Sequence, residues 1–217
     1  CSYRFQNGVN QWLIDQFGEK IITKDITTAE SMFSNSRDIT TIPFELNFSP
    51  NSSIAASCFY NCSNLKELPI CSNLPISSRL FYGCYNLRSL NGNKFKGYPE
   101  TISLLVDDML HDCWGLKNVG PLFDNIPDIV SGNSIYGMYR TFYNCVSLEE
   151  LIHLPFIYPP YAGYGMNETF SNCSRLKNLT FRGGVLTSTK AKADTLSLIA
   201  NVGYCSTGNV NNLKTYG

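Results

Sequence analysis

Residues 140–155, RTFYNCVSLEELIHLP, place Phe142, Cys145, Leu148 and Leu151 at strict intervals of three. A half-buried strand alternates apolar and polar residues every two positions, and an extended amphipathic helix drifts between three and four. A strict period of three fits neither element. It indicates instead a short unit that repeats along the chain.

The same ten-residue frame, F-x-x-C-x-x-L-x-x-L, returns at five other places. Its copies start at Phe33, Phe59, Phe81, Leu110, Phe142 and Phe170. These starts lie 26, 22, 29, 32 and 28 residues apart, close to the length of solenoid repeat units. A single unit of that size cannot bury its own apolar face, so the copies are predicted to stack into one continuous core. We number the frame positions from one to ten.

The predicted core consists of the apolar and cysteine positions of the frame. Its members are Phe59, Cys62, Leu65, Leu68, Phe81, Cys84, Leu87, Leu90, Cys113, Leu116, Phe142, Cys145, Leu148, Leu151, Phe170, Cys173, Leu176 and Leu179. The first copy keeps the frame with Ser36 in place of cysteine. In each unit we expect a short helical or irregular turn from Phe to Cys and a short parallel strand around the second Leu. In LKELPI, residues 65–70, Leu68 and Ile70 are predicted to face the core on either side of Pro69.

Both ends of the chain differ from the frame, as the caps of a solenoid must. Residues 1–30 are predicted to form an N-terminal cap with a short helix, whose apolar face carries Val9, Trp12, Leu13 and Phe17. Residues 31–182 hold the repeats. Residues 183–217 are predicted to form a C-terminal cap, with a helix from Ser188 to Val202 and a final strand segment.

The frame, with proline soon after it in LKELPICSNLP and LEELIHLP, resembles the BspA-like leucine-rich repeats of bacterial surface proteins. Related repeats occur in anaerobic protists and in phages of gut bacteria. The likeness covers roughly residues 31–182 and implies an α/β repeat fold, a leucine-rich-repeat solenoid with short parallel strands and short helices or irregular turns. It also implies a non-enzymatic, secreted or surface-displayed module that binds a protein or glycan partner.

Charge and hydropathy exclude several other classes of protein. The 217 residues contain 17 basic and 17 acidic side chains, so no global field gathers nucleic acid or an anionic membrane. No apolar run approaches the roughly 20 residues that span a bilayer. The chain starts at Cys1 without an initiator Met, as expected of a processed chain or a piece of a longer one.

The frame cysteines allow three interpretations. Zinc sites usually bring ligands in close pairs such as C-x₂-C, and single cysteines one repeat apart supply no such pair. Disulfides between neighbouring repeats are sterically possible, yet five stacked positions cannot all pair. We therefore expect a row of buried, unpaired thiols that pack as small hydrophobes. The candidates for a bridge are Cys1, Cys58, Cys71 and Cys205, which lie outside the frame.

Catalytic and cofactor motifs are missing from the sequence. The chain has two histidines, His111 and His153, and a Cys or Ser nucleophile needs a base within reach. The run His111–Asp112–Cys113 invites comparison with a triad, but adjacent residues point in different directions. We find no phosphate-binding loop, paired-carboxylate signature or metal motif, and we expect no enzyme activity and no cofactor.

One row of charge is a candidate binding surface. The eighth frame position is basic in four of the five later copies, at Lys66, Arg88, Lys117 and Lys177, with Glu149 as the exception. Such a row can meet an acidic partner. Alternatively, acidic residues at the ninth position, Glu67 and Glu150, make a solvated face that compensates its own charge.

Aromatic insertions supply the second set of candidates. Phe156, Tyr158, Tyr161 and Tyr164 cluster with Pro and Gly in PFIYPPYAGYG, and Tyr136 and Tyr139 lie in SGNSIYGMYR. Exposed tyrosines on a rigid loop commonly bind protein or sugar, whereas the alternative is that the rings cover the core. Together with the resemblance to BspA-like repeats, these candidates predict recognition or adhesion at a cell or virion surface. The runner-up is a structural component in which the repeats scaffold a virion or surface assembly.

Overall fold

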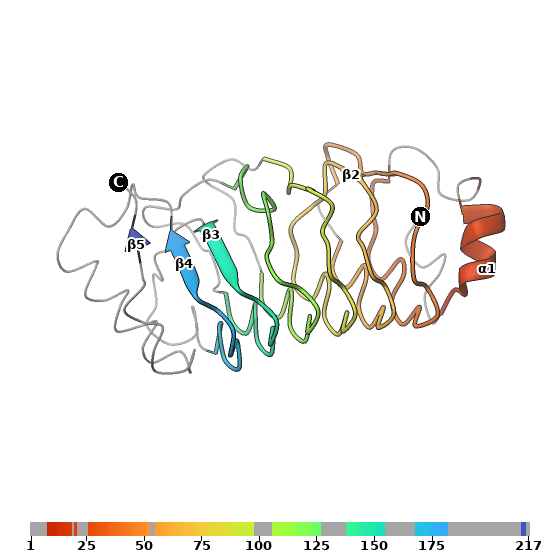
Figure 1. Cartoon of the computed structure of the whole chain (residues 1–217). Coiled ribbons are helices and arrows are strands. Elements are labelled where there is room, and N and C mark those ends of the chain that lie inside the picture. Colours follow the sequence, from red (N-terminus) through yellow and green to blue (C-terminus); the bar gives the residue numbers. More distant parts are fainter. Residues whose placement is uncertain are drawn as a thin grey trace.

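The computed structural model of the chain describes residues 8–18, 20, 26–52, 55–97, 106–126, 138–154, 168–181 and 214–215. The described helical elements are α1 (Gln11–Leu13) and the π-helical turn that follows it (Ile14–Gly18), and Lys20 is helical as well. The strands are β1 (Leu46–Asn47), β2 (Cys71–Ser72), β3 (Glu150–Leu154), β4 (Asn178–Phe181) and β5 (Lys214–Thr215). Figure 1 shows successive repeat units side by side between α1 and these last strands.

All strand pairs are parallel. β1 pairs with β2, with Leu46 opposite Cys71, and β4 lies between β3 and β5. Glu150 of β3 lies opposite Asn178 of β4, so the ninth frame positions of two successive repeats are in register. The strands expected around the second frame Leu therefore form in the last two copies. At Leu68 the corresponding segment makes a single bridge, Glu67 to Ser89.

Hydrogen bonds between successive repeats hold the turn segments together. The first-position N–H donates to the carbonyl just before the next frame, as from Phe33 to Cys58 (2.8 Å). The third-position N–H donates to the second-position carbonyl of the next repeat, as from Asn61 to Tyr82 (2.7 Å). Both bonds recur at all five junctions between the six copies. The repeats are thus joined in register by the backbone itself.

Hydrogen bonds within each repeat explain the period of three. The fourth-position N–H donates to the first-position carbonyl, and the seventh-position N–H donates to the fourth-position carbonyl. In the fifth copy these bonds run from Cys145 to Phe142 (3.1 Å) and from Leu148 to Cys145 (3.0 Å). Each bond spans three residues, so the segments from Phe to Cys are chains of turns rather than helices. Frame side chains consequently emerge on one side every three residues.

Left-handed backbone at fixed positions makes these turns possible. The third position has positive φ in all six copies, at Asn35, Asn61, Gly83, Asp112, Asn144 and Asn172. Asn, Asp and Gly tolerate this region because their short side chains avoid the clash that a bulky residue suffers. The amides also bond to one another, Asn172 Nδ2 donating to Asn144 Oδ1 (2.7 Å). We call these third-position residues the asparagine row.

The core lies beneath the turns and contains every frame residue predicted for it. Relative exposures of those residues are all 7% or less. The Phe side chains stack on one another across repeats, with ring centroids 5.4 Å apart for Phe33 and Phe59 and 5.6 Å for Phe59 and Phe81. Burial of each such ring is worth about 1.5–3 kcal/mol.

The frame cysteines form a hydrogen-bonded row, which we call the thiol ladder: Cys62, Cys84, Cys113, Cys145 and Cys173. Each thiol donates to the first-position carbonyl of the preceding repeat, as from Cys62 to Phe33 (3.0 Å) and from Cys173 to Phe142 (3.0 Å). These carbonyls also accept the fourth-position N–H of their own repeat, so both lone pairs are used. All five cysteines are free and buried, as are Cys58 and Cys71, which were candidates for a bridge.

The expectation for LKELPI is confirmed at Leu68, which is buried, and wrong at the two residues after it. Ile70 is 54% exposed and Pro69 is buried, the reverse of what was predicted for these two positions. Pro69 has no N–H to give to a ladder, so β2 begins beyond it at Cys71, which is buried in its place. Asn93 Oδ1 accepts the Cys71 N–H (2.7 Å) and fixes that shifted register.

The apolar face predicted for the N-terminal helix is also wrong in part. Val9 is buried, but Trp12, Leu13 and Phe17 are 62%, 37% and 43% exposed, and Ile14 fills the core instead. The helix has only three residues before it widens into a π-helical turn, which breaks the expected spacing. The Val9 N–H donates to Ser36 Oγ (3.1 Å), so the serine in the first copy binds the cap.

Gly83 is the one glycine in the asparagine row and provides a test of its backbone. Gly83→Ala places a Cβ at positive φ (+71°) and should lower the free energy of unfolding by about 1–2 kcal/mol. Gly83→Asn should lower it less, because Asn tolerates that region. In both variants the new Cβ meets the flexible side chain of Asn61. The difference in unfolding free energy between the two variants therefore measures the cost of the left-handed backbone. Urea unfolding followed by circular dichroism measures it, and equal losses for the two variants would contradict the assignment.

Burial of the thiols predicts a loss of stability at alkaline pH. Burial raises the pKa of Cys62 to about 12 and raises the pKa values of Cys84, Cys113 and Cys145 as well. Above a pH of about 8.5 the unfolded chain releases thiol protons that the folded chain retains, so the free energy of unfolding falls. Each buried thiol should contribute about 1.4 kcal/mol per pH unit to that fall, up to its folded-state pKa.

The control for this prediction is Cys145→Ala, which removes one thiol of the ladder. It should cost about 1 kcal/mol at neutral pH and make the alkaline slope shallower by about 1.4 kcal/mol per pH unit. Urea unfolding between pH 8 and 10.5, read against the wild type, measures the difference. An unchanged slope would mean that the Cys145 thiol is not protected by folding.

Candidate binding surface

A column of stacked rings runs along the second frame position. It consists of Tyr60, Tyr82, His111 and Tyr143, and we call it the ring column. Neighbouring centroids are 5.1, 4.4 and 4.6 Å apart, and the rings lie within 20° of parallel. His111 is buried between Tyr82 and Tyr143, which are half-buried. Burial and the nearby Asp112 carboxylate raise the pKa of Tyr82.

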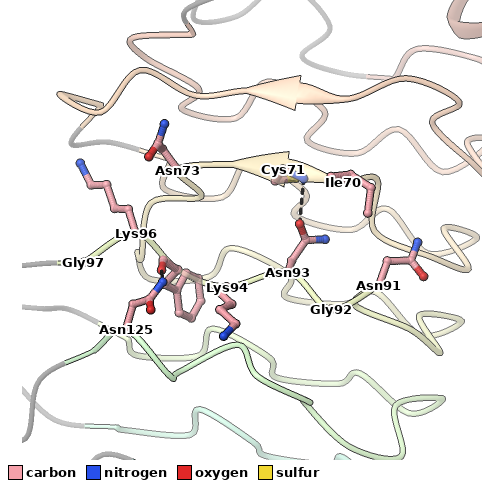
Figure 2. A pocket seen from close by; sticks show the side chains of 11 residues that line it. Ile70, Cys71, Asn73, Asn91, Gly92, Asn93, Lys94, Lys96, Gly97 and Asn125 are labelled. Atoms are coloured by element: carbon pink, nitrogen blue, oxygen red, sulfur yellow. Dashed lines mark hydrogen bonds between the residues drawn. The ribbon is translucent and has the colours of Figure 1, made fainter.

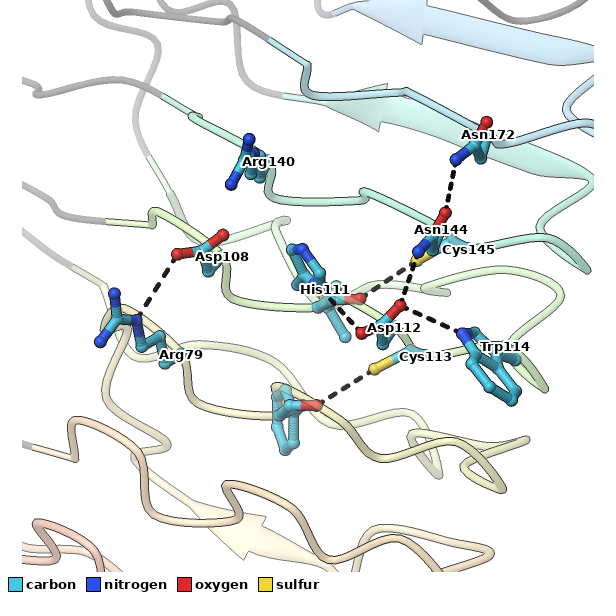
Figure 3. A network of polar contacts seen from close by, with 12 residues as sticks. Arg79, Asp108, His111, Asp112, Cys113, Trp114, Arg140, Asn144, Cys145 and Asn172 are labelled. Carbon is cyan, nitrogen blue, oxygen red and sulfur yellow. Dashed lines mark hydrogen bonds and ion pairs between the residues drawn. The ribbon is translucent and has the colours of Figure 1, made fainter.

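Two ion pairs lie beside the ring column, and each joins successive repeats. Arg79 Nε lies 3.5 Å from Asp108 Oδ2, and Arg140 Nε donates to Glu168 Oε2 (2.6 Å). Figure 3 shows Arg79 directed at Asp108. The Arg140 guanidinium also lies over the rings of Tyr139 (4.8 Å) and Tyr143 (5.4 Å). These charges therefore serve contacts within the protein.

The basic row, defined by Lys66, Arg88, Lys117 and Lys177, is exposed. Backbone hydrogen bonds place the eighth positions in register: Arg88 N–H donates to the Lys66 carbonyl (2.8 Å), and Lys177 N–H to that of Glu149 (2.9 Å). Within the described part of the chain none of the four basic side chains forms an ion pair. Glu149, which interrupts the row, lies 3.7 Å from Arg175. The acidic ninth position therefore does not neutralise the row by direct pairing.

An open groove of about 390 Å³ lies across the segments that follow the second, third and fourth copies of the frame, lined among others by Cys71, Asn93 and Asn125. Figure 2 shows these asparagines turned toward neighbouring backbone. Asn93 Nδ2 donates to the carbonyls of Pro69 (2.9 Å) and Leu90 (2.7 Å), and Asn125 Nδ2 to that of Phe95 (2.9 Å). The Asn93 and Asn125 amide N–H groups that could bind a ligand therefore already donate to backbone carbonyls of the protein.

The lysines of this groove are engaged as well. Lys94 Nζ lies 3.0 Å from Asp124 Oδ2. Lys96 Nζ donates to the carbonyls of Pro50 and Ser52, and burial lowers its pKa. The groove is accordingly a weaker binding candidate than the basic row.

The run His111–Asp112–Cys113 does not form a nucleophile and base pair. His111 Nδ1 lies 3.2 Å from Asp112 Oδ2, without the alignment of a hydrogen bond. The Cys113 thiol donates to the Phe81 carbonyl (3.3 Å), and burial raises its pKa well above the ordinary value. A thiolate is thus disfavoured at this position. His153 belongs to β3, and its side chain is outside the described part.

The described part of the chain contains neither a metal-binding cluster nor a membrane-spanning helix. No group of three or more His, Cys, Asp or Glu side chains there is arranged to hold a metal ion. No helix there has the length and apolar character needed to cross a bilayer.

Most of the predicted aromatic loop candidates lie outside the described residues. They are Tyr136, Phe156, Tyr158, Tyr161 and Tyr164. Tyr139 is described: its ring lies beneath Arg140, and its N–H donates to Asp107 Oδ1 (3.3 Å). Burial raises the pKa of that aspartate.

Sequence reasoning missed two aromatic features. The ring column could have been predicted from the sequence, because three of its four members are Tyr residues directly after the first frame position. The second feature is the contact between Tyr85 and Trp114, both at the fifth position of the frame, whose centroids are 4.4 Å apart. A comparison of fifth positions across the copies would have found it.

The comparisons with known proteins agree with the repeat geometry. The family described as "BspA type Leucine rich repeat region" matches residues 19–118 and 125–207, in six copies. This family is typically a surface or adhesion repeat module and is generally non-enzymatic. No curated protein matches the chain. The matched residues make up most of the 217, and the chain therefore belongs to the BspA-type leucine-rich repeat family.

Proposed function

We propose that the chain is a non-enzymatic recognition or adhesion module, displayed at a cell or virion surface, whose repeats form a right-handed solenoid. It binds a protein or glycan partner through the basic row. Family membership supports surface display, since such repeats are typically surface or adhesion modules.

The carrying observation is a contrast between two sets of basic side chains. Arg79, Lys94, Arg140 and Arg175 are each within 4 Å of a carboxylate. The four members of the basic row have no such partner in the described part of the chain, yet they recur at one position. The first four basic side chains pair with carboxylates of the protein, whereas those of the basic row are exposed to solvent.

Electrostatics adds a second argument. Backbone hydrogen bonds hold the eighth positions of successive repeats in register, so Lys66 and Arg88 lie side by side, and like charges held next to each other repel. A recurring cation at one position is therefore unfavourable for folding alone. An acidic ligand placed along the row, either a carboxylate-rich protein segment or an acidic glycan, removes that repulsion and gains steering at long range.

Charge reversal at the centre of the row tests the proposal. The double variant Arg88→Glu, Lys117→Glu should bind immobilised heparin or poly-glutamate about 100-fold more weakly at low salt, and wild-type affinity should itself fall as salt rises. Arg88 and Lys117 are chosen because their ninth-position neighbours, Ser89 and Asn118, are uncharged. Biolayer interferometry measures both dependences.

The matched control reverses two exposed cations away from the row, Lys20→Glu and Arg37→Glu. This control changes the net charge by the same amount but leaves the basic row intact. It should therefore retain wild-type affinity within about threefold. Equal losses in the two double variants, or no binding of either probe by the wild type, would refute the role of the row. Self-association that the row variant abolishes would indicate the assembly scaffold instead.

A further inference from the structure

A second exposed surface lies at the fifth frame position, away from the basic row at the eighth. Trp114 is 47% exposed, and its ring lies 4.4 Å from that of Tyr85 at a tilt of 36°. Val146, the fifth-position residue of the next copy, is 38% exposed. We call Tyr85 and Trp114 the aromatic platform.

Hydrogen bonds within the protein fix the orientation of the indole. Trp114 Nε1 donates to Asp112 Oδ1 (3.2 Å), which also accepts from Asn144 Nδ2 (2.8 Å). Figure 3 shows Trp114 attached in this way to Asp112, a member of the asparagine row. The polar edge of the ring is thus satisfied internally, while much of its surface remains open. A ring held in this way loses little conformational entropy when a ligand packs on it.

The fifth and sixth frame positions around the platform carry no charge, and the adjacent Asp112 carboxylate already accepts hydrogen bonds from Trp114 and Asn144. The fifth and sixth positions of the three central copies are Tyr85, Asn86, Trp114, Gly115, Val146 and Ser147. Asn86 Nδ2 donates to the Ser63 carbonyl (2.9 Å) and to Asn64 Oδ1 (3.2 Å). No described residue donates to Asn86 Oδ1 or bonds to the Tyr85 hydroxyl. Both groups remain available as neutral hydrogen-bonding partners.

We propose that the aromatic platform binds a neutral glycan. The C–H face of a sugar ring packs on the electron-rich face of an aromatic ring, and sugar hydroxyls both donate and accept hydrogen bonds, which matches Tyr85 and Asn86. The adjacent Asp112 carboxylate would repel an anionic ligand, and it offers little to a cation because it already accepts two hydrogen bonds within the protein. A stable protein interface buries about 1,000 Å² or more, which one aromatic pair does not provide.

The fluorescence of Trp114 offers a direct test, because the chain has only two tryptophans. Trp12→Phe leaves Trp114 as the sole indole. This variant is titrated with maltohexaose, cellohexaose and chitohexaose, each to about 10 mM, well above the millimolar dissociation constants of weak ligands. At least one neutral oligosaccharide should change Trp114 emission and protect it from acrylamide quenching, and oligogalacturonate and oligoproline should not.

Calorimetry with the oligosaccharide that binds then identifies the surface. In the wild-type background, Trp114→Ala should weaken binding at least 10-fold and Tyr85→Ala by a similar factor. The control Trp12→Ala, at a ring that is more exposed than Trp114, should leave binding unchanged. Arg88→Glu, Lys117→Glu should also leave it unchanged, which separates this site from the proposed function of the basic row.

Three results would overturn the proposal. They are no response of Trp114 to any of the three neutral oligosaccharides, unaltered sugar binding in Trp114→Ala, and a response to oligoproline alone. Thermal melting of Trp114→Ala guards against misfolding as the cause of lost binding. If that variant melts well below the wild type, the more conservative Trp114→Phe, expected to keep part of the affinity, takes its place.

Discussion

Backbone hydrogen bonds between successive repeats are the interaction on which the rest of this structure depends. First-position and third-position N–H groups point to the next repeat, so the intervening N–H groups must bond within their own turn, three residues back. That alternation requires left-handed backbone at the third position, where the chain has Asn, Asp or Gly in every copy. The cysteine then follows, because the first-position carbonyl keeps one free lone pair that a small buried donor from the next repeat can reach. Cys84, for example, fills it at Phe59 (3.1 Å).

Because the repeats stack in register, residues at the same frame position form a row. The side-chain chemistry of each row determines which contacts that row makes. Phe at the first position gives ring-on-ring packing, and Asn at the third gives amides that bond to one another. Two residues before the frame, alternate signs at Arg79, Asp108, Arg140 and Glu168 give ion pairs between repeats. The basic row is the exception, since like charges recur without pairing. The same stacking that stabilises the other rows places the cations of the basic row side by side on the surface, without carboxylate partners in the described part of the chain.

Much of the core was predictable, because the frame repeats six times and apolar spacing is visible in sequence. The free thiols were predictable too, since a single cysteine per unit supplies neither zinc ligands nor enough partners for bridges. The carbonyls that these thiols bond could not be predicted, because they depend on turn geometry. Ile70 was misplaced because Pro69 shifts the start of β2, and Trp12 because α1 ends after three residues. The aromatic platform went unseen because Tyr85 and Trp114 are 29 residues apart and differ in type.

Infrared spectroscopy of the S–H stretch tests the thiol ladder most directly. Hydrogen bonding to a carbonyl lowers this stretching frequency, and burial slows exchange of the thiol proton with deuterium. The native protein in D₂O should therefore retain S–H absorption, at a frequency below that of the urea-unfolded chain in H₂O, and Cys145→Ala should reduce its intensity. Rapid loss of the S–H band from the native protein, or a band at the unfolded frequency, would contradict a ladder in which each frame thiol bonds the preceding repeat.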